Sequence, residues 1–414
     1  MPRGTAKLSA LDTSFAHTRS LNPFSIYVFG GDRNSPSFDQ IREVLAQRAS
    51  EIPLLGVKVM SPSPWIYPRW TVDPTPSADK IRELDVASWD EVLAWIEGHA
   101  DDDIDPRSRP WRLMVARDVS EVPGATGTCT VVVTQHSHAL ADGMAWSEVA
   151  VGLFGDGPTA IGPEATVDRV RKLDFVRELA GIPVDIARSC RPLIRLAKTG
   201  AGRIHDSTNA ITHPQAAFDR WIRVRPLSKD VFKVSGETVT TSAVWRAAVG
   251  IDRYRRKFDL DVSELSFEVP LSIRRGGATN VSNALVLREV DAALEKDDKT
   301  KLALIGEAMS EARRFARGSD ALLAVQVADL LPARLVQRDA PRKAAPVSVS
   351  SYIRRGPLEL LGAKCVWSGG GVGRDNASLS VRAIGYGDTV AMSVSGNSHA
   401  IEHPDVLVDL MLGA

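Results

Sequence analysis

Cysteine is scarce in this sequence of 414 residues, and its placement argues against two kinds of site. Cys129, Cys190 and Cys365 lie far apart without close pairs, which disfavours a disulfide framework and a cysteine zinc site. His399 and His403 have no third ligand near them in the sequence, so we expect no resident metal ion. Cysteine usage of this kind is typical of a reducing compartment, and we expect the protein to be cytoplasmic.

Long apolar runs and an excess of charge are also missing. No stretch approaches the roughly 20 apolar residues that span a bilayer, and the first residues lack the apolar core of a signal peptide. The 51 basic and 51 acidic residues cancel, so the chain has no overall field that would recruit nucleic acid or an anionic membrane. We therefore expect a soluble or peripheral protein that does not bind nucleic acid. The sequence carries no signal of an oligomeric state.

Hydrophobic residues, by contrast, make up 44% of the chain, enough for a sizeable core. The length exceeds the size at which one core usually stops growing, which predicts two or three domains. Strand-like and helix-like segments alternate in residues 1–157 and again in residues 215–414. Residues 158–214 are basic, contain prolines and have helix-like apolar spacing. We predict an α/β protein whose two comparable lobes are joined by a helical crossover over residues 158–214.

Local signals predict many of the individual elements. Two capping boxes, Ser37 with Gln40 and Ser88 with Glu91, predict the starts of two helices. The β-branched run at residues 130–134 predicts a strand. In the second lobe we predict strands at residues 221–224, 265–273, 284–290, 347–351, 361–367, 379–384 and 389–395, and helices at residues 242–258, 302–315 and 321–331.

The run at residues 130–134 leads into TQHSHALADG, residues 134–143, which is the strongest candidate for a functional segment. His138 would stand where a strand gives way to a turn, a common position for catalytic groups. His136 would share a face with His138 if the strand continued through both, and we expect it to be structural. The apolar spacing after Gly143 predicts a helix that Asp142 could N-cap.

Residues 138–143 resemble the second histidine onward of the HHxxxDG motif of the chloramphenicol-acetyltransferase-like superfamily. Other segments are similar, in order and spacing, to landmarks of the wax ester synthase/diacylglycerol acyltransferase family within it. These segments are LDTSF at residues 11–15, IPLL at 52–55, IDPRSRPW at 104–111, VPLSIR at 269–274 followed by Asn280, and residues 347–357 with LGA at 361–363.

The resemblance implies two chloramphenicol-acetyltransferase-like lobes with an active-site tunnel between them, in which an acyl thioester and an alcohol meet at His138. A neutral imidazole can take the proton of an alcohol as the alcohol attacks a thioester carbonyl. We therefore expect an acyl-CoA-dependent O-acyltransferase that forms a lipid ester of the wax ester or acylglycerol (triacylglycerol) type. Direct attack needs no acyl-enzyme and no cofactor, because acyl-CoA is itself a substrate.

The neighbours of His138 have supporting roles in this interpretation. Asp142 either caps the following helix or, as the family implies, orients the histidine loop through a basic partner, for which we suggest Arg274. Arg274 could instead be a solvated strand end. Gly143 would allow close backbone approach, and a helix N-terminus there could stabilise negative charge developing on the thioester oxygen. Asn280 is matched to the asparagine of the family segment.

Two departures from the family pattern leave other functions open. Ser137 replaces the first histidine of the motif, and Thr240 and Thr241 replace an Asn-Asp pair. Ser137 cannot act as a base, and the two threonines remove a carboxylate. One alternative is an acyltransferase that uses a carrier-protein thioester, or a hydroxyl or amine of a specialised metabolite. Another is a non-catalytic binder of lipid or acyl-CoA, although the retention of His138 argues against it.

Basic segments raise two further alternatives. Residues 253–257 and 274–275 could contact the phosphates of CoA, although such runs are more often solvated helix faces or turns. Residues 182–197 are apolar with interspersed arginines and could rest on a membrane or a lipid droplet. A stretch of this kind more often packs on its own protein.

Overall fold

A computed structural model defines the fold. The predicted crossover, residues 158–214, lies outside the described residues except for residues 161–162 and 181, and Asn280 and His399 lie outside them too. The structure describes residues 7–17, 22–31, 36–61, 63, 65–99, 102, 104–155, 161–162, 181, 220–234, 236–261, 265–274, 283–336, 347–372, 379–398 and 401–413.

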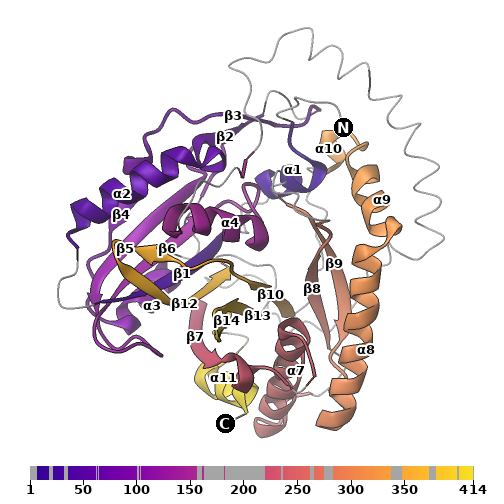
Figure 1. The fold of residues 1–414 in the computed structure, drawn as a ribbon. Helices are drawn as coiled ribbons and strands as arrows, with labels where there is room; N and C mark the ends of the chain where they lie inside the picture. The colour runs from indigo at the N-terminus through magenta and orange to yellow at the C-terminus, as the bar shows by residue number, and fades with distance from the viewer. Residues whose placement is uncertain are drawn as a thin grey trace.

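The first lobe is built on a six-stranded mixed sheet (Figure 1). β1 pairs antiparallel with β6 on one side and with β12 on the other, and it is buried along nearly its whole length. In spatial order the strands are β11 (Glu359–Leu360), β12 (Ala363–Val372), β1 (Pro23–Gly30), β6 (Cys129–His136), β5 (Trp111–Val119) and β4 (Ile81–Glu83).

Both faces of this sheet are covered, which explains why β6 is buried at every position. Val132 packs on one face with residues of α2 (Phe38–Glu51) and α4 (Gly143–Phe154), whereas Val131 packs on the other with α3 (Trp89–Gly98). The capping boxes predicted for α2 and α3 are confirmed. The lobe also holds α1 (Ala10–His17), a two-stranded sheet of β2 (Val57–Met60) and β3 (Arg69–Val72), and the 3-10 turns Pro53–Gly56 and Ser77–Lys80.

The second lobe has its own six-stranded sheet and core. Its strands, in spatial order, are β7 (Arg220–Ser228), β14 (Thr389–Asn397), β13 (Leu379–Tyr386), β10 (Val347–Ile353), β8 (Ser266–Ser272) and β9 (Leu285–Asp291). Its helices are α6 (Lys229–Phe232), α7 (Val239–Lys257), α8 (Asp298–Arg317), α9 (Ser319–Ala328), α10 (Ala333–Val336) and α11 (Pro404–Leu412). The predicted two-lobed α/β architecture is confirmed.

Two strands from the second half of the chain belong to the first sheet. β11 and β12 follow β10 in sequence, yet β12 pairs with β1. Gly370 permits this close pairing, because a Cβ there would lie 2.4 Å from the carbonyl oxygen of Phe24. The two lobes are therefore tied together by backbone hydrogen bonds. The boundaries 1–157, 158–214 and 215–414 remain a prediction from the sequence.

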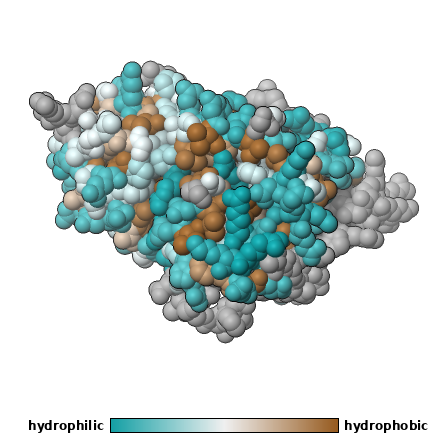
Figure 2. Space-filling model, turned by 90° about the horizontal axis from the view of Figure 1, so that it is seen from below, coloured by the Kyte–Doolittle hydropathy of each residue, from teal (hydrophilic) through white to brown (hydrophobic). Residues whose placement is uncertain are grey.

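The surface of the described residues mixes polar and apolar side chains. Figure 2 shows hydrophobic residues in several separate areas between hydrophilic ones on the face seen from below. Within the described part of the chain, no helix has the length and hydropathy needed to cross a bilayer.

Candidate active site

The segment that follows β6 is fixed at both ends by buried side chains. β6 ends at His136, so the face that His136 and His138 would share in a continuous strand does not form. The ring of His136 stacks on that of Trp146 with centroids 3.7 Å apart, and its Nε2 donates to the carbonyl oxygen of Ala141 at 3.2 Å. Burial holds the pKa of His136 well below its usual value. His136 therefore has the structural role that the sequence predicts.

His138 stands in the turn that follows, and it differs from its neighbours in exposure. Gln135, His136 and Ser137 are at most 2% exposed, and residues 139–142 are also buried, whereas His138 is partly exposed. Its ring stacks on Phe15 of α1, with centroids 4.1 Å apart. The turn thus presents one imidazole and buries the side chains around it.

Asn283, from the segment that leads into β9, determines which ring nitrogen of His138 carries the proton. Its Nδ2 donates at 2.8 Å to the carbonyl oxygen of His138 and at 2.8 Å to Oδ1 of Asp12. Because both of these groups accept, they together favour the orientation in which the amide nitrogen faces them and Oδ1 faces the imidazole. Oδ1 accepts from Nδ1 of His138 at 3.0 Å. The proton therefore resides on Nδ1.

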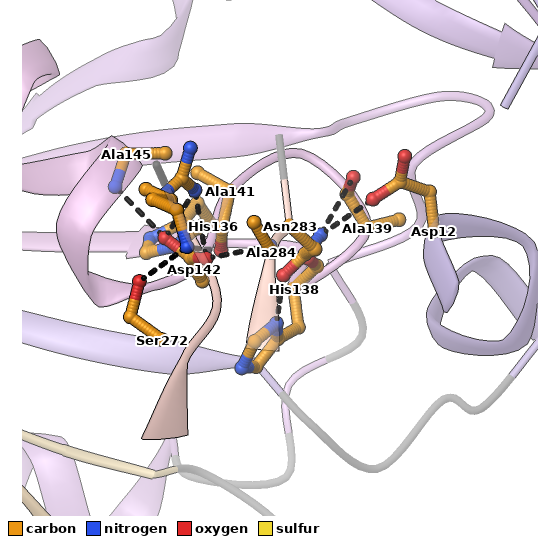
Figure 3. Close-up of polar contacts among 11 residues, drawn as sticks. Asp12, His136, His138, Ala139, Ala141, Asp142, Ala145, Ser272, Asn283 and Ala284 are labelled. Carbon is orange, nitrogen blue, oxygen red and sulfur yellow. Dashed lines mark hydrogen bonds and ion pairs between the residues drawn. The ribbon is translucent and has the colours of Figure 1, made fainter. Parts of the chain in front are cut away.

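The second ring nitrogen, Nε2, is consequently the basic one. In Figure 3 it points away from Asn283 and the other residues drawn, and among the described residues no hydrogen-bond partner faces it. Burial lowers the pKa of His138 to about 4, with the positive charge of Arg382 acting in the same direction and the negative charge of Asp142 opposing it. At neutral pH His138 is therefore a neutral imidazole with an available lone pair on Nε2.

Asp142 joins the histidine turn to the second lobe. Its Oδ1 accepts from the backbone N–H of Ala145 at 2.9 Å, which confirms the predicted N-cap of α4. Both carboxylate oxygens also accept from Nη2 of Arg274 at 2.7 Å, so the suggested partner is confirmed. Oδ2 accepts in addition from the N–H of Ala284, next to Asn283. Asp142 is 4% exposed, and this ion pair is shielded from solvent.

Gly143 allows the close approach that the sequence predicts, but the group that approaches is a side chain of the second lobe. A Cβ at Gly143 would lie 2.7 Å from the ring of Tyr352. The hydroxyl of Tyr352 accepts from Nη2 of Arg354 at 3.0 Å, and Nη1 of Arg354 donates to Tyr27 at 2.6 Å. Gly143 therefore lets the start of α4 dock against the end of β10.

The sheet of the second lobe opens where this docking occurs. β8 and β10 run parallel but pair through two residues each at their starts, Phe267 with Val347 and Glu268 with Ser348. Arg274 follows the end of β8, and Tyr352 lies near the end of β10. The histidine turn is held by residues from both of these ends.

Ser137, Thr240 and Thr241, which depart from the family pattern, each form a hydrogen bond through the side-chain hydroxyl. Ser137 is 2% exposed, and its hydroxyl accepts from the N–H of Ala139 at 3.3 Å, which stabilises the turn. The hydroxyl of Thr240 contacts that of Ser351 on β10 at 2.6 Å. Thr241 lies beside the N-cap of α7, Thr238. These hydroxyls link elements of the fold.

Sequence reasoning missed two residues of the site. Asn280 lies outside the described residues, and the asparagine that contacts His138 is Asn283, three positions later. Asp12 was part of the LDTSF landmark, yet that pattern does not show that its carboxylate reaches the second lobe. An asparagine just before a strand and an aspartate at a helix start are ordinary signals, so their meeting is visible only in three dimensions.

Other candidate groups have structural partners. Within the basic run at residues 253–257, Arg253 pairs with Asp298 at 2.9 Å and Arg256 with Asp252 at 2.8 Å. Cys129 is buried in β6, where it packs as the sequence indicates. In the part of the chain that the structure describes, no group of three or more His, Cys, Asp or Glu residues is arranged to hold a metal ion.

Solved acyltransferase structures share this fold. A wax ester synthase/diacylglycerol acyltransferase from Marinobacter aquaeolei VT8 is 16% identical, with a TM-score of 0.63 over 98% of this chain and 96% of that chain. TRI3 trichothecene 15-O-acetyltransferase from Fusarium sporotrichioides is 13% identical, with a TM-score of 0.63 over 98% and 94%. A starter condensation domain of rhizomide synthetase RzmA, in complex with C8-CoA and Leu-SNAC, is 11% identical, with a TM-score of 0.60 over 99% and 93%.

These likenesses confirm the fold that the motif resemblance implies. No protein-family model and no curated protein sequence matches the chain. At identities of 11–16% the structures establish the architecture, and the reaction has to be argued from the site itself.

Proposed function

We propose that this protein is an acyltransferase in which His138 is the general base. The observation that carries the proposal is the state of this imidazole: it is partly exposed, it is neutral at pH 7, and its Nδ1 proton is held by Asn283. Nε2 is thereby left to accept a proton from a substrate. The proposal specifies an acyl-CoA donor and an alcohol acceptor.

The reaction proceeds by direct attack. The acceptor hydroxyl donates its proton to Nε2 of His138 while its oxygen forms a bond to the thioester carbonyl carbon. The tetrahedral intermediate collapses by breaking the carbon–sulfur bond, and the thiolate takes the proton from the imidazolium to leave as CoA-SH. No covalent acyl-enzyme forms, so no serine or cysteine nucleophile is needed.

Two features of the site stabilise the charges that develop during the reaction, on the imidazolium of His138 and on the thioester oxygen. The negative charge of Asp142 favours the imidazolium that forms on His138. The N-terminus of α4 at Gly143 carries a partial positive charge, and it lies beside the turn where negative charge develops on the thioester oxygen.

The proposed product class is a lipid ester, and the motif resemblance supports it. The motif segments and the likeness to a wax ester synthase/diacylglycerol acyltransferase favour a lipid ester of the wax ester or acylglycerol type. The complex of the RzmA condensation domain with C8-CoA supports acyl-CoA as the donor. We also expect a tunnel at the active site. We expect the protein to be cytoplasmic and to associate peripherally with membranes or lipid droplets.

A second candidate uses the same chemistry on another acceptor. Ser137 is buried and serves the turn, and Thr240 contacts Ser351 where the family pattern has a carboxylate. These differences from the family pattern favour a different acceptor, such as a hydroxyl or amine of a specialised metabolite. They also favour a carrier-protein thioester as an alternative donor. TRI3, a trichothecene 15-O-acetyltransferase, has the same fold.

An assay of thiol release distinguishes these functions. The protein is incubated with acyl-CoAs of different chain length and with a panel of long-chain alcohols, diacylglycerol, hydroxylated small metabolites and amines, and free thiol and product mass are followed. Lipid-ester synthesis predicts thiol release that depends on a fatty alcohol or diacylglycerol. Release with a metabolite or amine alone identifies the second candidate, and binding of acyl-CoA without turnover contradicts both.

The pH dependence of the reaction tests the state of His138. The base works in its neutral form, which predominates above its pKa of about 4. We expect kcat/KM to stay level between about pH 6 and 8 and to fall on the acidic side near pH 4. The measurement is initial thiol release across this range, with tryptophan fluorescence as a control for folding. A fall centred near 6.5, the usual histidine value, would contradict the described environment.

A further inference from the structure

α1 contacts the second lobe through its first residues and the histidine turn through Phe15. At its start, the N–H of Ala10 donates to Oδ1 of Asp329 at 2.7 Å. Further along, Asp12 meets Asn283, and Phe15 stacks on His138. Figure 1 shows α1 between the first lobe and the segment of α9 and α10. The helix thus lies against the histidine turn and the second lobe at once.

The two carboxylate oxygens of Asp12 have different partners. Oδ2 accepts weakly from the N–H of Ser9 at 3.4 Å, while the N–H of Asp12 donates to the hydroxyl of Ser9 at 3.0 Å, as in a helix cap. Oδ1 instead accepts from Nδ2 of Asn283 at 2.8 Å. Capping therefore accounts for one oxygen, and the other is directed at the site. The residue is 5% exposed, so water does not readily replace this contact.

The contact between Asp12 and Asn283 affects His138, because the Asn283 amide donates to Asp12 through Nδ2 and accepts from His138 through Oδ1. Figure 3 shows Asn283 between Asp12 and His138. Its nitrogen has two protons, which are shared among Asp12 and the carbonyl oxygens of His138 and Ala139, at 2.8, 2.8 and 3.4 Å. If the amide rotated by 180°, its nitrogen would face Nδ1 of His138, which would then have to be an acceptor, and the proton would move to Nε2.

We propose that Asp12 is a positioning residue that holds the Asn283 amide in the orientation in which Nδ1 of His138 is protonated and Nε2 is basic. The proposal rests on the proposed function for its kinetic consequences, but the tautomer it assigns can be measured without any substrate. Asp12 does not contact the reacting atoms and acts through Asn283.

Asp12 can hold the Asn283 amide whether its carboxyl group is charged or neutral. Burial raises the pKa of Asp12 to about 7, with the hydrogen bonds from Asn283 and Ser9 opposing the shift and the negative charge of Asp142 adding to it. Both the acid and the carboxylate keep an oxygen that accepts from Nδ2 of Asn283. We therefore expect no step in the pH profile near 7, although Asp12 titrates there.

Three variants test the proposal. Asp12→Ala removes the acceptor, Asp12→Asn retains an amide oxygen that can accept, and Ser9→Ala disturbs the helix start while leaving Oδ1 of Asp12 on Asn283. We expect kcat to fall about 10- to 100-fold in Asp12→Ala with KM little changed, because a misplaced catalytic group costs that much in rate. Asp12→Asn and Ser9→Ala should stay within a few-fold of the unaltered protein.

The second readout is the tautomer of His138. Long-range proton–nitrogen NMR spectra of histidine-labelled protein, with His138 assigned from a His138→Gln variant, should show Nδ1 protonated in the unaltered protein and in Asp12→Asn. In Asp12→Ala both tautomers should be populated. An unchanged tautomer in folded Asp12→Ala would overturn the proposal, and so would an Asp12→Asn variant as impaired as Asp12→Ala. If the protein transfers no acyl group at all, the proposed function fails while the spectra still decide the role of Asp12.

Discussion

Replacing His138 with alanine should lower the rate of acyl transfer by about 100- to 10,000-fold, the usual contribution of a general base. No described neighbour can take over, because His136 is buried against Trp146 and its Nε2 is bonded to the carbonyl oxygen of Ala141. The loss should appear in kcat, since the base acts on the bound acceptor in the transition state. The measurement is thiol release from acyl-CoA in the presence of the alcohol that supports turnover.

A second substitution separates the lost base from a disturbed site. His138→Gln keeps a polar amide side chain in the turn, but it provides no basic nitrogen. Both variants should be equally inactive, and the glutamine variant should be the more stable of the two. His99→Ala is the matched control, because it also removes an imidazole. His99 lies at the end of α3, where its ring stacks on Trp95. Full activity in folded His138→Ala or His138→Gln would rule out the general-base mechanism.

The second large effect is expected for stability. Asp142→Ala should lower the free energy of unfolding by about 3–5 kcal/mol, because it leaves a shielded arginine without its carboxylate. The side chains of Asp142 and Arg274 are 5% and 15% exposed, and the same substitution removes the cap of α4 and the acceptor of the Ala284 N–H. Urea unfolding followed by fluorescence measures the change.

An exposed ion pair supplies the control for this experiment. Asp405 pairs with Arg223 at 2.8 Å, but 57% of its side chain is exposed, so Asp405→Ala should cost about 0–1 kcal/mol. Combining Asp142→Ala with Arg274→Met should restore part of the lost stability, because the shielded positive charge is removed together with its carboxylate. Equal losses for Asp142→Ala and Asp405→Ala would show that the Asp142 pair does not hold the lobes together.

The local elements of the fold could be read from the sequence because their signals are local. The Ser37 and Ser88 capping boxes, the β-branched run that became β6, and Asp142 ahead of α4 each involve residues within four positions of one another. Burial alternation and capping depend on the nearest turns of the chain, so one sequence suffices. The alternation of strand-like and helix-like segments predicted two lobes, the motif resemblance implied the same architecture, and the structure confirms it.

Contacts between distant segments could be predicted from the sequence only where the family resemblance indicated them. The Asp142–Arg274 pair was suggested because the family pattern named a basic partner, and the structure contains it. The contact of Asn283 with His138 was not predicted, because sequence spacing does not show which residue before a strand reaches a distant segment, and Asn280 lies outside the described residues. The pairing of β12 with β1 crosses more than 300 residues, and no local signal encodes it.

The sequence by itself determined which residue could act: His138 follows a buried strand and precedes an Asp-Gly helix start, and these are properties of ten consecutive residues. Tertiary structure alone decided which of its ring nitrogens is basic. Asp12 from α1 and Asn283 from the second lobe meet at its Nδ1, and their hydrogen bonds leave Nε2 as the basic nitrogen. The physical reason is that an imidazole has two nearly equivalent tautomers, and only partners brought from distant parts of the chain select one.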